Sequence, residues 1–167
     1  MSILSQQNID LIKKVFFLAM MDGYVNEDTK KHKIIKLPGS RLITFEHYED
    51  NQQFVVNDLY FVTNLSNYSH GVTSISCDGQ PVWMMSYEGI YRKCDIPLLR
   101  KALHHAYSKK LFFGGRGAGT HPLGNHHVYY NDVTKGNFES FSGGERIVNE
   151  LTGTRVGWHE YRGLLMV

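Results

Sequence analysis

Apolar residues recur at helical spacing near the start of the chain. The positions on this stripe are Ile9, Ile12, Phe16 and Ala19. A repeat of about three to four residues predicts an amphipathic helix with one buried face. Ser5 precedes the stripe as an N-cap and Gly23 follows it as a C-terminal stop. We therefore expect a helix from residue 5 to about residue 21.

A second stripe of the same kind lies in the middle of the chain. Its apolar positions are Leu99, Ala102, Leu103 and Ala106. Asp95 precedes it as an N-cap, and Pro97 is tolerated in the first turn of a helix. Lys109 and Lys110 carry positive charge that complements the C-terminal end of the helix dipole. We expect a second helix that begins at Asp95 and ends near these lysines.

Alternating or continuous apolar runs predict strands over much of the remaining chain. The segments with these patterns are residues 42–48, 54–65, 72–77, 82–91, 127–133, 138–151 and 156–167. Asp78-Gly79 is a strong signal for a hairpin turn, and Gly153 lies at the last turn. The glycine-rich stretch 114–124 is expected to be a loop.

The composition agrees with a fold rich in strands. Aromatic residues make up 13% of the chain, with 10 Tyr and 9 Phe, and such residues suit half-buried pleated surfaces. A length of 167 residues is enough for one domain with its own core. We expect an α+β fold in which two helices pack on an antiparallel sheet of about six to eight strands, with residues 1–167 forming a single domain.

A sequence pattern in the first half of the chain occurs again in the second half. The pattern G-x-x-V-x-x-x-x-Y-x-G occurs from Gly79 and again from Gly153, an offset of 153 − 79 = 74 residues. At this offset Asn57-Asp58 also matches Asn131-Asp132. One interpretation is that the matches arise by chance, because turn glycines and strand valines recur in many β proteins. The other interpretation is the duplication of a helix-plus-three-strand unit. The halves would then lie at about 5–92 and 95–167 and be related by a pseudo-twofold axis.

Duplication of this kind predicts a ligand cleft where the halves meet. Two aromatic pairs would supply its apolar walls, namely Trp83 with Trp158 and Tyr87 with Tyr161. Arg116 and Glu145 would supply polar anchors. The other interpretation is that these aromatic side chains simply fill the core.

The charge and the cysteine content argue against several classes of protein. The net charge is +2 and the basic residues are scattered, so nucleic-acid binding is not favoured. The densest run, from Lys30 to Lys36, is typical of a solvated loop. Cys77 and Cys94 are too few for a disulfide framework, and we find no targeting segment and no apolar run long enough for a membrane span. We expect a cytoplasmic protein with reduced thiols.

The motifs resemble a family of bacterial domains catalogued as domain of unknown function 5680. The residues that fit its patterns G-x-P-V-W-x-M-x-Y-x-G and F-x-G-x-E-x-I are Gly79, Pro81, Val82, Trp83, Met85, Tyr87, Gly89, Phe141, Gly143, Glu145 and Ile147. A last pattern, Y-x-G-G, fits Tyr161 and Gly163, but Leu164 replaces its final glycine. Family members stand alone or follow a helix-turn-helix domain, so the resemblance implies a sensory or regulatory role and no particular activity.

Several segments contain residue types that can bind phosphate or metal or act in catalysis, but none of them forms a recognisable catalytic motif. The glycine-rich loop follows a helix and opens a strand, the reverse of a dinucleotide loop, so we interpret it as a flexible connector or pocket lid. His121 with His126 or His127 could chelate a metal only if that loop folded back. Cys94 is separated from His104 by about 15 Å along the helix. We therefore predict no catalytic residue, no metal site and no cofactor.

The expected function is non-catalytic binding of a small molecule or peptide in the aromatic cleft. The alternative is a hydrolase-like enzyme that uses scattered histidine and glutamate residues, including the carboxylates of Glu88 and Glu160. A further alternative is a protein-interaction module, in which case the chain would form a homodimer or dock through a sheet edge.

Overall fold

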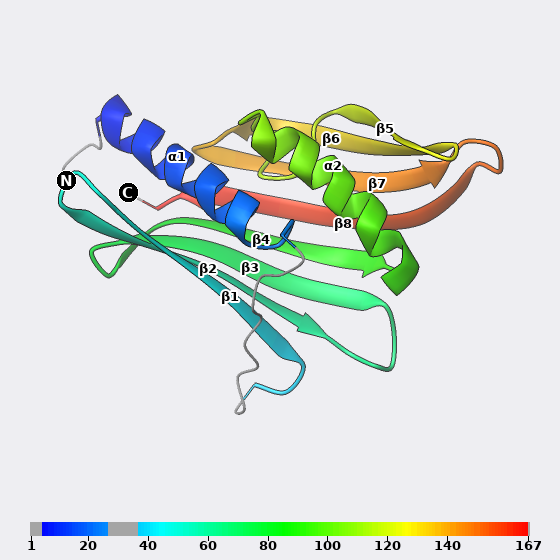
Figure 1. Ribbon diagram of the computed structural model, residues 1–167, viewed down its shortest axis with the longest axis horizontal. Coiled ribbons are helices and arrows are strands. Elements are labelled where there is room, and N and C mark those ends of the chain that lie inside the picture. Colours follow the sequence, from blue (N-terminus) through cyan, green and yellow to red (C-terminus); the bar gives the residue numbers. More distant parts are fainter. Residues whose placement is uncertain (1–4, 27–36, 167) are drawn as a thin grey trace.

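The fold is an α+β arrangement dominated by one antiparallel sheet, as predicted. It is seen in a computed structural model that describes residues 5–26 and 37–166 (Figure 1). The helices are α1 (Gln6–Asp22) and α2 (Ile96–Ser108), the second preceded by a 3-10 turn over Lys93–Asp95. The strands are β1 (Ser40–Glu49), β2 (Gln52–Val62), β3 (Tyr68–Cys77), β4 (Gln80–Tyr91), β5 (Thr120–Gly124), β6 (His127–Asn137), β7 (Ser140–Asn149) and β8 (Thr154–Leu165).

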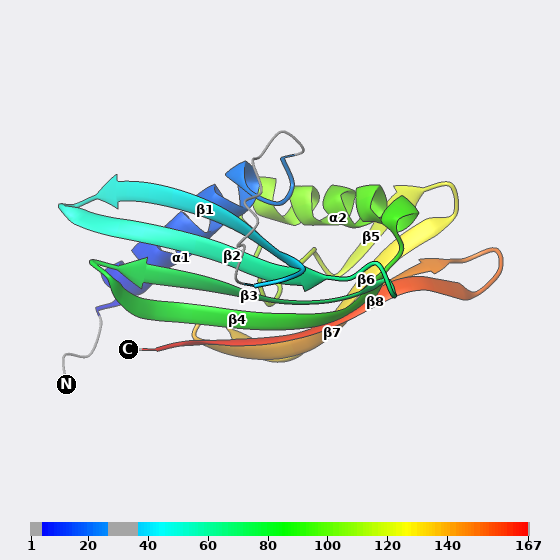
Figure 2. The same cartoon turned by 90° about the horizontal axis from the view of Figure 1, so that it is seen from below.

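The eight strands form one sheet in the order β1-β2-β3-β4-β8-β7-β6-β5. Each half of the chain is an antiparallel meander, and the two meanders join where β4 pairs with β8. Both helices lie over the same face of the twisted sheet, which we call the inner face (Figure 2). The other face is called the outer face.

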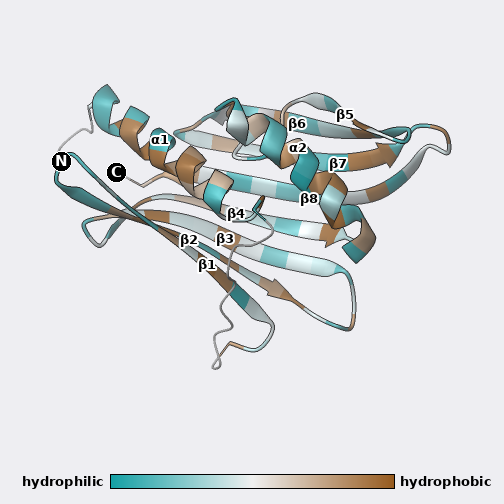
Figure 3. Ribbon diagram, in the orientation of Figure 1, coloured by the Kyte–Doolittle hydropathy of each residue, from teal (hydrophilic) through white to brown (hydrophobic). Residues whose placement is uncertain are grey.

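Local sequence signals account for both helices. Ser5 is the N-cap of α1, where its side chain accepts a hydrogen bond from the Asn8 amide, and Gly23 is the C-cap, as predicted. Asp95 occupies the predicted cap position of α2 but makes no side-chain capping bond, because its carboxylate pairs with Arg92 at 2.6 Å. Hydrophobic and hydrophilic bands alternate along both helices, as in amphipathic helices (Figure 3). No helix in the described part of the chain is long and apolar enough to span a membrane.

One strand was missed from the sequence. Residues 114–124 were expected to be a loop throughout, but Thr120–Gly124 forms β5 and pairs with β6. Pro122 cannot donate a ladder hydrogen bond, and β5 is an edge strand, which is where a sheet tolerates proline. Each helix is thus followed by four strands, so the expected unit of a helix plus three strands was one strand short.

The centre of the core is an aromatic cluster that joins the helices to the sheet. Phe16 of α1 lies 5.2 Å from Trp83 of β4 and 6.0 Å from Tyr107 of α2, measured between ring centroids. Trp83 is fully buried and stacks on Phe138, whose carbonyl accepts the indole N–H at 3.0 Å. The indole is therefore both packed and hydrogen-bonded, as a buried tryptophan requires.

Two hairpins repeat the same contact between a tyrosine and a glycine. Tyr87 of β4 is the register partner of Gly71 in β3, and Tyr161 of β8 is the partner of Gly143 in β7. A Cβ atom at Gly71 would lie 2.4 Å from Cζ of Tyr87, and one at Gly143 would lie 2.4 Å from the hydroxyl oxygen of Tyr161. Each ring therefore lies directly over the glycine of the neighbouring strand.

The substitution Gly71→Ala tests this packing. The added methyl group overlaps a buried ring, so we expect the free energy of unfolding to fall by about 2 kcal/mol. The matched control is Gly119→Ala, where no atom lies within 4 Å of the added Cβ, and a change below about 0.5 kcal/mol is expected. Urea denaturation of both variants measures the difference, and equal midpoints would contradict the close contact.

Candidate functional site

A cavity of about 410 Å³ opens on the inner face of the sheet. Its walls come from strands β1, β2, β3, β4 and β8, from the end of α1, from the length of α2 and from the glycine-rich loop. Six tyrosines line it: Tyr24, Tyr60, Tyr68, Tyr87, Tyr91 and Tyr107. The charged side chains in its lining are Arg41, Asp58, Lys93, Arg100 and Arg116. A volume of this size is within the range of small-molecule sites.

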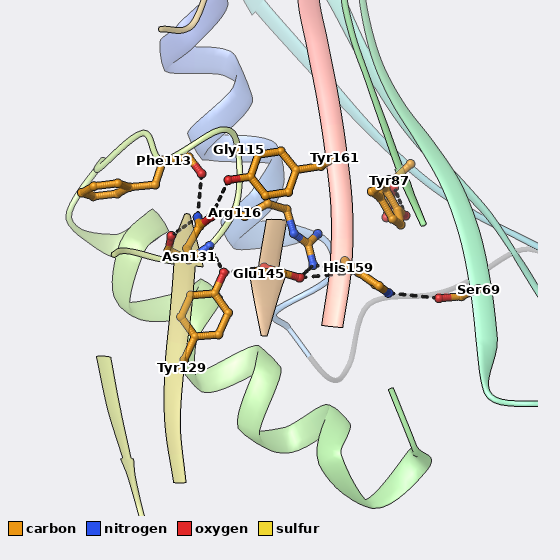
Figure 4. A network of polar contacts seen from close by, with 12 residues as sticks. Ser69, Tyr87, Phe113, Gly115, Arg116, Tyr129, Asn131, Glu145, His159 and Tyr161 are labelled. Atoms are coloured by element: carbon orange, nitrogen blue, oxygen red, sulfur yellow. Dashed lines mark hydrogen bonds and ion pairs between the residues drawn. The ribbon is translucent and has the colours of Figure 1, made fainter. Parts of the chain in front are cut away.

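A buried ion pair lies at the end of the cavity nearest β8. The guanidinium of Arg116 donates from Nη2 to Oε1 of Glu145 at 2.5 Å, and the two residues are only 6% and 2% exposed (Figure 4). The hydroxyl of Tyr129 donates to the second carboxylate oxygen. Arg116 also lies over the ring of Tyr87, 5.3 Å from its centroid. The pair therefore holds together the glycine-rich loop, β6, β7 and the central strand β4.

Glu145 remains ionised despite its burial. Burial alone would raise the pKa of its carboxyl group, but the charge of Arg116 and the hydrogen bonds from His159 and Arg116 outweigh it and lower the pKa to about 2. Removing either partner would leave a buried charge uncompensated, which is costly.

His159 links this ion pair to the cavity. Its Nδ1 atom is 3.5 Å from Oε1 of Glu145 and 3.3 Å from Nη2 of Arg116, and its Nε2 atom is 3.3 Å from the hydroxyl of Ser69 (Figure 4). Burial lowers the pKa of the imidazole, and the charge of Arg116 lowers it further against the opposing effect of Glu145. At neutral pH the ring is therefore uncharged.

A second polar cluster occupies the first half of the sheet. Oδ1 of Asp58 accepts hydrogen bonds from the Tyr87 hydroxyl at 2.7 Å and from the Thr73 hydroxyl at 3.0 Å. Burial, and then the nearby Asp58, raise the pKa of Tyr87 far above its ordinary value. The tyrosine hydroxyl therefore stays protonated and acts as a donor.

The glycine-rich loop, which we expected to be a flexible connector or a pocket lid, is buried at residues 114–117 and contributes to the cavity wall. Gly114, Gly115 and Gly117 are buried, as is Arg116 between them. A Cβ atom at Gly114 would lie 2.2 Å from the ring of Tyr161, so only glycine allows the backbone to approach so closely. The Tyr107 hydroxyl donates to the Gly115 carbonyl at 2.9 Å. These contacts fix the loop so that Arg116 lies in the cavity wall.

Two of the six predicted site residues line the cavity, namely Tyr87 and Arg116. Glu145 lies behind Arg116 and holds it. Tyr161 is buried beside Tyr87, where its hydroxyl donates to the side-chain oxygen of Asn131. These four residues lie around the junction of β4 with β8, while the two tryptophans lie elsewhere.

The predicted roles of both tryptophans need correction. Trp83 is part of the aromatic core and does not line the cavity. Trp158 is three residues from Tyr161 on one strand, and side chains at odd spacing point to opposite faces. It therefore lies on the outer face, where Arg155 stacks over it at 5.5 Å. The alternation rule could have excluded Trp158 from the site in advance.

The same rule could have found His159, which is two residues before Tyr161 and shares its face. Ser69 carries no comparable signal, because only the sheet register brings it near His159. Glu88 and Glu160 are register partners, but both are exposed on the outer face, away from the cavity.

The histidines near the glycine-rich loop make one notable contact. The rings of His105 and His121 stack with centroids 4.0 Å apart. Within the part of the chain that the structure describes, no three histidine, cysteine, aspartate or glutamate side chains are grouped so as to hold a metal ion.

The substitution Glu145→Gln tests the ion pair. The pKa of Glu145 in the folded chain is about 2, below the ordinary 4.5, so the ionised pair stabilises the fold above pH 4.5 and this contribution is lost as the pH falls toward 2. We expect the variant to lose about 3 kcal/mol of stability at neutral pH. Its deficit relative to the parent chain should shrink below pH 4.5.

Chemical denaturation at several pH values provides the measurement. The control is Glu160→Gln on the exposed outer face, for which a change below about 0.5 kcal/mol is expected. A deficit in Glu145→Gln that is the same at every pH would show that the carboxylate charge is not the stabilising element.

Comparison with known proteins agrees with the resemblance seen in the motifs. The family model described as domain of unknown function (DUF5680) matches residues 58–164. This span begins at Asp58 in the cavity wall and includes Tyr87, Arg116, Glu145 and His159. No curated protein and no solved structure matches the chain. With the family model covering most of its length, the chain belongs to the DUF5680 family.

Proposed function

We propose that this chain binds a small molecule in the tyrosine-lined cavity. The observation that carries the proposal is the hydroxyl of Tyr91, a cavity-lining residue that is only 5% exposed. Among the described residues this buried hydroxyl has no hydrogen-bond partner. A buried polar group without a partner costs about 1–3 kcal/mol. A ligand that accepts its hydrogen bond would recover that energy.

The lining indicates the chemistry of the ligand. Tyrosine rings offer flat apolar contact together with hydroxyl donors. Four cationic side chains and one carboxylate line the cavity in the described part of the chain. Since Tyr91 and Arg116 stay protonated, hydrogen-bond donors predominate. We therefore expect a small molecule with an aromatic ring and an acceptor group such as a carbonyl or carboxylate.

We also infer that the chain arose by duplication, with one half at about 5–92 and the other at about 95–167. The register of the central strands supports this. Trp83 pairs with Leu165, and Tyr91 pairs with Gly157. Tyr87 and Tyr161, which the offset of 74 makes equivalent, pair with each other midway between these two pairs. A twofold axis that exchanges the halves would pass through this central pair.

Details of the hairpins support the same inference. The register shifts after Ile75 in the first half and after Ile147 in the second, and both isoleucines are fully buried. Tyr87 and Tyr161, the register partners at the middle of the central pairing, both donate to a side-chain oxygen on the second strand of their own half. One oxygen belongs to a carboxylate, Asp58, and the other to an amide, Asn131.

The halves differ where the cavity lies. In the second half, the glycine-rich loop packs against Tyr161 and Tyr129 on the inner face. In the first half, the inner face beside Tyr87 borders the cavity. The second half nevertheless contributes Arg116 and His159 to the lining. This asymmetry favours a single binding site that both halves build. A binding domain of this kind suits the sensory or regulatory role that the family resemblance implies.

Ligand-observed NMR with benzyl alcohol and benzoate tests the proposal. We expect saturable binding with a Kd of roughly 1 mM or tighter, as for a fragment that gains about 0.5 kcal/mol per heavy atom. Ile96→Trp should abolish binding, because Ile96 is half-buried in the cavity wall and the larger ring would occupy the space.

The matched control is His104→Trp, on the exposed side of the same helix, which should bind both probes as the parent chain does. Absence of saturable binding to the parent chain, or unchanged binding to Ile96→Trp, would contradict the site.

A further inference from the structure

A serine, a histidine and a glutamate lie in line at the edge of the cavity. Oγ of Ser69 is 3.3 Å from Nε2 of His159, and Nδ1 of the same ring is 3.5 Å from Oε1 of Glu145 (Figure 4). Ser69 and His159 line the cavity, while Glu145 is buried behind them. A nucleophile, a base and an acid that orients the base stand in this order in serine hydrolases of unrelated folds.

The sheet register explains how these distant residues meet. Ser69 pairs with Gly89, Gly89 pairs with His159, and His159 pairs with Glu145, so all four lie in one row across β3, β4, β8 and β7. Ser69 and His159 are two strands apart, about 10 Å between backbones. Gly89 has no side chain in the gap, and a Cβ atom there would lie 2.5 Å from Cδ2 of His159. The glycine allows the two side chains to meet above it.

We infer that Ser69, His159 and Glu145 form a nucleophilic triad, and that the chain hydrolyses a small carboxylic ester bound in the cavity. The inference rests on the proposed binding site and adds a reaction to it. Ser69 is the nucleophile and His159 the general base. Glu145 is a positioning residue that acts through His159.

The general-base role specifies the tautomer of His159 that the reaction uses. Nδ1 lies 3.3 Å from Nη2 of Arg116 and 3.5 Å from Oε1 of Glu145. A proton on Nδ1 points to that carboxylate, because a guanidinium cannot accept a hydrogen bond. This tautomer leaves the lone pair of Nε2 facing the hydroxyl of Ser69, as a general base requires. The imidazole is uncharged at neutral pH because its pKa is lowered by burial.

Tyr91 supplies a donor for the reacting carbonyl. Its ring contacts the His159 ring edge-on at 4.8 Å, and its buried hydroxyl has no partner among the described residues. Burial raises the pKa of this hydroxyl well above its ordinary value, so it remains a donor. A preorganised donor of this kind stabilises the negative charge that develops on the carbonyl oxygen in the transition state.

The reaction has two balanced steps. Oγ of Ser69 bonds to the ester carbonyl carbon while its proton passes to Nε2 of His159, and the ester C–O bond then breaks as that proton moves to the departing alcohol or phenol. Water next attacks the acyl-serine and gives its proton to His159. The acid is released and the proton returns to Ser69. The tyrosine walls favour an ester with an aryl group.

Acylation by 4-nitrophenyl acetate tests the triad. With the parent chain we expect a burst of 4-nitrophenol and an acetyl group on Ser69, located by peptide mass spectrometry. Ser69→Ala should slow the burst by roughly 10³-fold or more. The matched control is Ser74→Ala, on the outer face of the same strand β3 and away from the cavity, and it should react as the parent chain does.

The pH dependence tests Glu145 separately from its structural role. The burst rate should rise with pH as His159 loses its proton, with a midpoint below the ordinary value of 6.5. In Glu145→Gln the midpoint should move lower still, because the carboxylate that raises the pKa of His159 is gone. A loss of folded protein alone would reduce the amplitude of the burst without moving this midpoint.

Two results would overturn the triad: no acetyl group on Ser69 in the parent chain, or an unchanged burst in Ser69→Ala. Benzyl alcohol binding, measured by NMR on the same samples, separates this failure from failure of the site. Binding without acylation would leave the binding function standing and remove the triad. Absence of both would remove the binding site and the triad together.

Discussion

The ion pair between Arg116 and Glu145 is the constraint on which the candidate site depends. Two opposite charges are removed from water, and neither is tolerable there without the other. The pair fixes the glycine-rich loop against β7, orients His159 and places the guanidinium over Tyr87. The positions of the cavity wall, the His159 imidazole and the glycine-rich loop therefore all depend on this one ion pair.

The close packing around the candidate site requires glycines at several positions. Gly114 and Gly117 bring the loop backbone close to Tyr161 and Tyr129, and Gly89 opens the gap between Ser69 and His159. At each position a side chain would meet atoms that are already packed. The close approaches explain why a chain so rich in large aromatic residues also contains 16 glycines, since large rings need adjacent surfaces without side chains.

The two halves of the chain have the same order of helix and strands, but they differ in the polar groups that bond to their tyrosines. The tyrosine on the last strand of each half donates to a side-chain oxygen, from Asp58 in one half and Asn131 in the other. The register partner of Asp58 is Thr73, whereas the register partner of Asn131 is Glu145. The second half thus carries the carboxylate that anchors Arg116, while the first half borders the cavity. Under the proposed duplication, divergence of the two halves would concentrate the polar and charged groups at the boundary between them.

Local patterns in the sequence determined both helices, most of the strands, the Asp78-Gly79 hairpin and the strand-rich α+β class, because each depends on residues a few positions apart. They also identified Tyr87 and Glu145 through the motifs, and Arg116 as a polar anchor in the glycine-rich loop. The short edge strand β5 was hidden by its glycine and proline residues. The burial of Trp83 and the contact of Ser69 with His159, 90 residues away, were decided only by the tertiary structure. Strand register and helix packing arise from contacts between distant segments, and no local period in the sequence encodes them.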